Sequence, residues 1–177
     1  MKHALVIGLA LLNAACATTY GEIGSWTGDG VSADALSADT FRIRSRGNSN
    51  TEPSLIEDFA LLRAAETVKQ ACYTHFVVLD RADRTKVEEV VTPETVTKTV
   101  EEKEVDGKKT RVERRSVTPG SVSLEVRPGE DLVVKAVRLA PGAAAPEGAF
   151  SAEDILAHVS PRVVRRKDSP PVVFPAC

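Results

Sequence analysis

The chain of 177 residues contains few side chains of the kinds that carry catalysis or bind metals. Its three histidines are His3, His75 and His158. No pair of Cys or His residues has the spacing of a metal site. The Gly-x-Ser-x-Gly elbow of a serine nucleophile is absent, and no Gly-rich phosphate loop follows a predicted strand. We therefore expect no enzyme activity, no metal and no cofactor.

Two groups of charged residues could still form a catalytic or binding site. Glu57, Asp58 and Glu66 could resemble a carboxylate pair, but adjacent residues on a helix point in different directions, so a solvated helix edge is expected. Residues 41–46 alternate strictly, which predicts a half-buried strand with a basic outer stripe. The stripe consists of Arg42, Arg44 and Arg46.

The arginine stripe has two interpretations. It could bind anionic lipid head groups, a glycan or an acidic partner, or it could be the soluble outer face of the strand. A formal charge of −2 and the lack of aromatic residues between the arginines argue against a nucleic-acid surface.

The first fifteen residues predict a signal peptide. Residues 4–12 form an apolar run that is too short to span a bilayer as a helix. The following Ala14-Ala15-Cys16 resembles the lipobox of bacterial lipoproteins, although Asn13 stands where an aliphatic residue is usual. That resemblance implies lipidation at Cys16 and, since Ala17 is not Asp, an outer-membrane protein facing the periplasm. The alternative is cleavage after Ala17 and secretion to the periplasm.

Residues 16–38 are rich in Gly, Ser, Thr and Asp, which predicts a lipidated Cys16 followed by a flexible tether. With Cys16 lipidated, Cys72 and Cys177 remain in an oxidising compartment, where two remaining cysteines commonly pair. We expect a disulfide between them. The alternative is two unpaired thiols.

A strand, a helix and a strand are predicted in residues 41–80. The helix begins near residue 53, with Thr51 or Ser54 as its N-cap, and ends near Ala71. Its alanine-rich face is expected to lie close against a sheet, and that face consists of Ala60, Leu61, Ala64, Ala65, Val68 and Ala71. Residues 74–80 are nearly all apolar, which favours a strand buried on both faces. The two strands are expected to be a parallel pair joined by the helix.

Later residues predict further elements. Residues 121–127 and 132–139 alternate on either side of Pro128-Gly129 and are expected to form an antiparallel hairpin. A short helix follows at 151–159, with Ser151 as N-cap. Residues 160–177 form a Pro-rich tail.

Residues 83–119 are charged and have no aliphatic cluster, and Asp106-Gly107 is a two-residue hairpin signal. Folding there predicts three facing pairs: Glu104 with Lys109, Glu102 with Arg111, and Val96 with Val117. The prediction is a long hairpin arm with two polar faces. The alternative is a mobile charged loop, because isolated two-stranded ribbons are marginal in water.

The segments Arg46-Gly47-Asn48, residues 57–66 and Phe76-Val77-Val78 together resemble a family of small uncharacterised bacterial lipoproteins. Members share an R-G-N strand end, a D-F-x-L-x-R-A-A-E helix and an F-V-V strand, and residues 150–155 resemble the family's closing helix. The resemblance implies an α+β domain and carries no activity with it. Cys72 stands where that family usually has Gly.

The sequence therefore predicts an α+β domain at 39–159, with about four strands and one main helix, interrupted by the arm at 83–119. We expect a non-enzymatic envelope protein, anchored to the membrane by lipid, that binds a partner protein through the arm or the arginine stripe. The alternative is a small-ligand or lipid carrier with its pocket between helix and sheet.

Overall fold

The computed structural model describes residues 17–105, 108–140 and 142–177, and it confirms the α+β fold. The predicted signal peptide, Cys16 and the Asp106-Gly107 turn lie outside these residues. The chain divides into two compact units, of which one is Val87–Glu125 and the other is formed by the described residues up to Lys86 and from Val126 onward.

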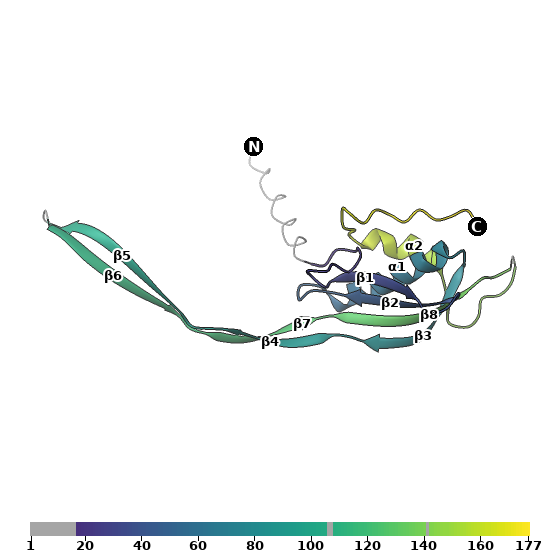
Figure 1. Cartoon of the computed structure of the whole chain (residues 1–177), viewed down its shortest axis with the longest axis horizontal. Coiled ribbons are helices and arrows are strands. Elements are labelled where there is room, and N and C mark those ends of the chain that lie inside the picture. The colour runs from purple at the N-terminus through teal and green to yellow at the C-terminus, as the bar shows by residue number, and fades with distance from the viewer. Residues whose placement is uncertain (1–16, 106–107, 141) are drawn as a thin grey trace, which may run out of the picture. The chain divides into compact units, whose positions relative to one another are not determined.

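The second of these units contains an antiparallel sheet of five strands rather than about four, in the order β1-β2-β8-β3-β9. The strands are β1 (Gly30–Ala35), β2 (Thr40–Arg46), β3 (His75–Asp83), β8 (Gly129–Val137) and β9 (Ala149–Ser151). Helix α1 (Pro53–Gln70) packs on this sheet, and α2 (Ala152–Val159) packs against α1. Both helices lie on the same side of the sheet (Figure 1).

Strand β8 lies between β2 and β3 and corrects two predictions. Both neighbours are antiparallel to β8, so β2 and β3 run in the same direction as predicted, but they are not a hydrogen-bonded pair. The predicted hairpin between residues 121–127 and 132–139 is also wrong. Strand β7 (Ser121–Arg127) pairs with β4 (Lys86–Thr92), while β8 joins the main sheet. Pairing both of its edges in the sheet gives β8 more backbone hydrogen bonds than a local hairpin would.

Strand β3 is not buried on both faces. Phe76 is fully buried, but Leu79 is 57% exposed, and the register with β8 shifts between Val78 and Asp80. The physical reason is that both helices cover the same face of the sheet, so the other face meets solvent (Figure 1). The apolar run of residues 74–80 therefore resembles a doubly buried strand without being one.

Helix α1 begins after Glu52, with Pro53 in its first turn. Neither predicted N-cap acts as one: the cap position is Glu52, without a side-chain hydrogen bond. The Thr51 hydroxyl instead contacts the Thr18 hydroxyl at 2.8 Å. The predicted alanine face of the helix is confirmed, and its fully buried members are Ala60, Ala64, Ala65 and Val68. These small side chains let the helix lie close against Ile43 and Val134 of the sheet.

The tether prediction is wrong for the described part of residues 16–38. Tyr20 and Val31 are buried in a second hydrophobic cluster with Phe59, and the Tyr20 and Phe59 rings meet edge to face with centroids 5.3 Å apart. Residues 30–35 form β1, which pairs with β2. The burial of Tyr20 and Val31 against α1 stabilises this segment in the fold. The prediction failed because the overall composition, rich in Gly and Ser, outweighed these two apolar residues.

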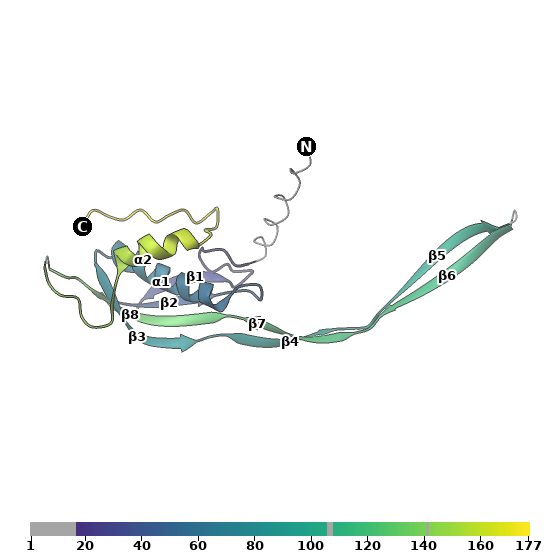
Figure 2. The ribbon, with the colours of Figure 1, turned by 180° about the vertical axis from the view of Figure 1, so that it is seen from behind.

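The C-terminal tail is held along α1 and ends at Cys177. After a short 3₁₀ turn at Ser160–Arg162, Tyr20 and Arg165 form a parallel bridge, and Val163 is buried. The tail crosses the helical side of the unit (Figure 2). The Cys72 and Cys177 sulfurs are bonded, which confirms the predicted disulfide.

Cys72 also ends α1. Its φ is +61°, the left-handed conformation in which glycine is commonest. The Cys72 N–H donates to the Lys69 carbonyl and the Tyr73 N–H to the Val68 carbonyl, both at 3.0 Å. This is the Schellman pattern, in which glycine is the usual residue at the left-handed position.

The predicted capping of α2 is confirmed, because the Ser151 hydroxyl accepts a hydrogen bond from the Asp154 N–H at 3.2 Å.

The hairpin arm is confirmed and is longer than predicted. Strands β5 (Thr95–Val105) and β6 (Lys108–Thr118) pair with the predicted register, which sets Glu104 opposite Lys109, Glu102 opposite Arg111 and Val96 opposite Val117. Strands β4 and β7 form a further two-stranded sheet, so the separate unit is Val87–Glu125 rather than residues 83–119.

Candidate functional site

The arginine stripe does not present three free charges. Arg44 forms an ion pair with Asp34 on β1. The Arg46 guanidinium lies 2.6 Å from the Asp131 carboxylate and donates to the Glu130 carbonyl at 3.0 Å. Arg42 is exposed and has no ion pair within the described residues. Two of the three arginines therefore connect β2 to its neighbouring strands, and a role for the stripe in binding stays a prediction.

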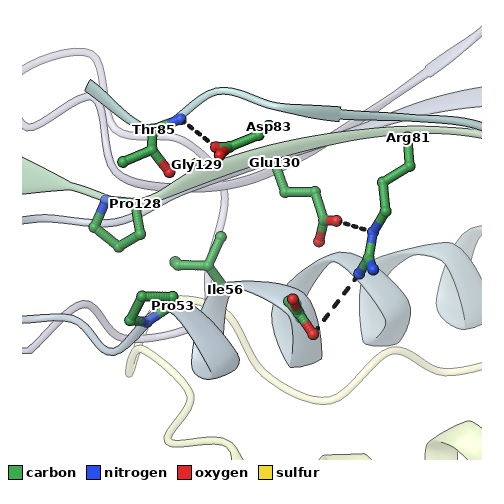
Figure 3. Close-up of a pocket in the computed structure, with 9 residues that line it drawn as sticks. Pro53, Ile56, Arg81, Asp83, Thr85, Pro128, Gly129 and Glu130 are labelled. Carbon is green, nitrogen blue, oxygen red and sulfur yellow. Dashed lines mark hydrogen bonds and ion pairs between the residues drawn. The ribbon is translucent and has the colours of Figure 1, made fainter. Parts of the chain in front are cut away.

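A pocket of about 260 Å³ lies between α1 and the adjoining ends of β3 and β8 (Figure 3). Its lining residues are Pro53, Ile56, Glu57, Arg81, Asp83, Thr85, Pro128, Gly129 and Glu130. The first turns of α1 supply one wall, the end of β3 a second, and the start of β8 a third. Three carboxylates and one guanidinium line this small space, so its lining has an excess of negative charge.

Arg81 connects two of the carboxylates across the pocket (Figure 3). Its Nε donates to Oε1 of Glu130, and its terminal nitrogen lies 3.7 Å from the Glu57 carboxylate. Hydrogen bonding from the Thr85 side chain lowers the pKa of Asp83, and so does the Thr85 N–H, which donates to the Asp83 carboxylate at 2.7 Å. The pocket therefore contains one cation for three acidic groups.

Glu130 is the most buried of these carboxylates, with 7% of the residue exposed. Its Oε2 is buried and has no hydrogen-bond partner within the described residues. Burial raises the pKa of Glu130, the charges of Glu57 and Asp83 raise it further, and Arg81 opposes them. Glu130 is therefore a buried acidic group with a hydrogen-bond partner at only one of its two oxygens within the described residues.

Glu66, predicted to lie at a solvated edge, is only 2% exposed. Its two oxygens accept hydrogen bonds from the Tyr20 hydroxyl, at 2.6 Å, and from Arg165 of the tail. The Arg63 guanidinium lies 3.9 Å from the Glu66 carboxylate. Burial raises the pKa of Tyr20, as does the adjacent Glu66 charge, so the hydroxyl remains a donor. This cluster attaches the N-terminal segment and the tail to α1, and its hydrogen-bonding groups already have partners.

Patterns in the sequence could have indicated both buried acids. Glu130 is two residues before Leu132 and four before Val134, so strand alternation puts it on their inward face. Glu66 follows Leu62 by four residues and Phe59 by seven, which is the spacing of one buried helix face. The signal in each case is an acidic residue in an otherwise apolar periodic series.

Under the middle of α1 the space between helix and sheet is filled by buried side chains, while a cavity of about 420 Å³ opens beside Ala33, Phe41 and Val172 at one side of the helix. A carrier function stays an alternative prediction. No group of three or more His, Cys, Asp or Glu residues in the described ranges could hold a metal ion.

None of the helices that the structure describes is both long and apolar enough to cross a membrane. The resemblance to small bacterial lipoproteins, like the lipid anchor, stays a prediction. Comparisons with protein-family models, with curated proteins and with solved structures find no match to this chain.

Proposed function

We propose that this chain is a non-enzymatic lipoprotein of the cell envelope, anchored at Cys16 and facing the periplasm. In this proposal the five-stranded unit is the folded base of the protein, and the arm, Val87–Glu125, binds an envelope partner protein.

One observation carries the proposal: the arm consists of two-stranded sheets that expose apolar side chains. Val91 and Leu124 are 63% and 70% exposed, and Val87 and Val122 are similarly exposed. Every described side chain of β4 and β5 is exposed. Two-stranded ribbons are marginal in water, and uncovered apolar strand residues are typical of surfaces that a partner covers.

Replacing Val87–Glu125 by a short Gly-Ser linker tests the role of the arm. The remaining unit has its own core, so its thermal unfolding midpoint is expected to stay within a few degrees of the wild-type value. Cross-linking in intact envelopes, followed by purification and mass spectrometry, is expected to lose the partner that the full chain captures. An unchanged set of cross-linked proteins would exclude the arm as the binding element.

Point variants provide the matched control within the arm. Leu124→Asp places a charge on an exposed apolar position, whereas Thr97→Asp places the same charge on an exposed polar position. We expect the first variant to weaken cross-linking at least tenfold and the second to change it less than twofold. Equal losses would indicate general charge repulsion instead of an apolar contact.

Cys16→Ser tests the anchor. Several acyl chains on one cysteine hold a protein stably on a membrane, so the variant is expected to leave the membrane fraction. The mass of the wild-type mature protein is expected to correspond to an acylated chain that begins at Cys16. A chain that begins at Thr18 without lipid, or a variant that stays on the membrane, would contradict the anchor.

A further inference from the structure

We propose that the pocket between α1, β3 and β8 binds a small alkylammonium ion, whose ammonium group is held by the Glu130 carboxylate. This inference is independent of the arm and of the lipid anchor, because every lining residue belongs to the five-stranded unit.

The first argument is the unsatisfied oxygen of Glu130. A buried carboxylate oxygen without a donor is costly, and Oε2 has none within the described residues. Figure 3 shows the Glu130 side chain extending from β8 toward α1, with its carboxylate beside Arg81 and with Ile56 and Pro53 at the other side of the pocket. Oε2 has almost no accessible surface, so in this proposal the Glu130 side chain turns toward the pocket when the ligand binds, and a ligand N–H group supplies the missing donor.

The second argument is charge. Glu57, Asp83 and Glu130 line the pocket with Arg81 as their single cation, so a ligand with one positive charge reduces the remaining imbalance. No group of three or more His, Cys, Asp or Glu residues in the described part of the chain could hold a metal ion. We therefore assign the positive charge to an organic cation.

The third argument is the remaining lining and the size. Pro53, Ile56 and Pro128 give the pocket apolar walls that can contact a short alkyl chain. The volume of about 260 Å³ is smaller than that of typical pockets for drug-sized ligands, and it suits a ligand of a few carbon atoms. A primary ammonium group is compact and carries three donors, whereas a guanidinium would repeat the group that Arg81 already provides.

Arg81 has a defined part in this proposal. Its side chain is 51% exposed and shares the Glu130 carboxylate with the ligand. Removing the guanidinium leaves Glu130 without its intramolecular cation, so an external ammonium ion is expected to bind more tightly. A purely structural role for the ion pair predicts the opposite result.

The experiment titrates n-butylammonium chloride into the 15N-labelled full chain and follows the backbone amide signals of Thr85, Gly129 and Glu130. We expect saturable shifts confined to the pocket. Tetramethylammonium, which has the charge without donors, and 1-butanol, which has the chain without charge, are expected to bind at least tenfold more weakly. Absence of saturation with n-butylammonium, or equal binding of tetramethylammonium, would overturn the proposal, as would saturable binding of calcium chloride at the same amides.

Three variants test the assignment of ammonium binding to Glu130. Glu130→Gln removes the charge with little change of shape and is expected to weaken n-butylammonium binding at least tenfold. Glu153→Gln removes the same charge from an exposed position on α2 and is expected to leave it unchanged. Arg81→Met is expected to tighten binding at least threefold, and it decides the question if Glu130→Gln does not fold. Unchanged binding in folded Glu130→Gln, or weaker binding in Arg81→Met, would contradict the assignment.

Discussion

Replacing Cys72 and Cys177 together by serine is expected to lower the free energy of unfolding by roughly 4–5 kcal/mol. The bond joins residues 105 positions apart, and a cross-link over such a loop strongly restricts the unfolded chain. The variant is expected to fold, because Val163 and Arg165 still attach the start of the tail to α1 and the N-terminal segment. Equilibrium unfolding in urea measures the difference, and a loss below about 1 kcal/mol would contradict the entropic argument.

A second double variant, with Cys72→Gly and Cys177→Ser, is the matched control. Both double variants lose the bond, but glycine adopts the left-handed conformation of residue 72 without the steric cost that serine has there. The glycine variant is therefore expected to be more stable than the serine variant by about 1 kcal/mol. Equal stabilities would show that the φ of +61° at this position carries no cost.

Glu66→Gln is expected to lower the free energy of unfolding by about 3–5 kcal/mol, the usual cost of breaking a buried ion pair. The Glu66 side chain is 2% exposed and that of its partner Arg165 is 16% exposed. The variant keeps an acceptor for the Tyr20 hydroxyl but leaves the Arg165 guanidinium without its neutralising charge. Chemical denaturation of the oxidised protein measures the loss.

Asp58→Asn is the control for the Glu66 prediction. Asp58 lies on the same helix and pairs with another tail arginine, Arg162, at 2.6 Å, but the Arg162 side chain is 59% exposed. Solvent screens such a pair, so its loss is expected to cost no more than about 1 kcal/mol. An equal loss of stability in the two variants would contradict the prediction, because it would show that the buried Glu66 pair stabilises the fold no more than the exposed Asp58 pair does.

Local patterns predicted the local elements well. The alternation of Phe41, Ile43 and Ser45, the alanine face of α1 and the cap at Ser151 depend on neighbours within a few residues, and all three are confirmed. The arm register also follows from a local feature, the Asp106-Gly107 signal. Such features are readable because one turn or one period determines them.

The pairing partners of β8 could not be predicted from local sequence patterns. Residues 129–137 pair with β2 and β3, which are distant in sequence, instead of with the nearby residues 121–127. Local pairing and long-range pairing both satisfy the alternation of β8. The choice between them depends on which arrangement buries Leu132 and Val134 against α1. That burial is a property of the tertiary packing and cannot be read from the local sequence.

For the two buried acids, too, the local sequence predicts one part of the site and the tertiary structure decides the other. Alternation and helical spacing place Glu130 and Glu66 on inward faces, but burial of an acid is costly unless something compensates for it. The partners of Glu66 come from residues 20 and 165, and that of Glu130 comes from residue 81. No sequence pattern links such distant positions.

By itself, the sequence determined the fold class, the main helix, the alternating strand at residues 41–46 and the facing pairs of the hairpin arm, because short-range sterics and periodic burial specify them. Compartment reasoning predicted the disulfide, and the folded chain brings Cys72 and Cys177 together. Only the tertiary structure decided the strand order, the packing of residues 17–38 and the pocket around Glu130. Each of these features depends on segments that are far apart in the chain and meet only when the core forms. The contacts that stabilise them therefore leave no pattern in the local sequence.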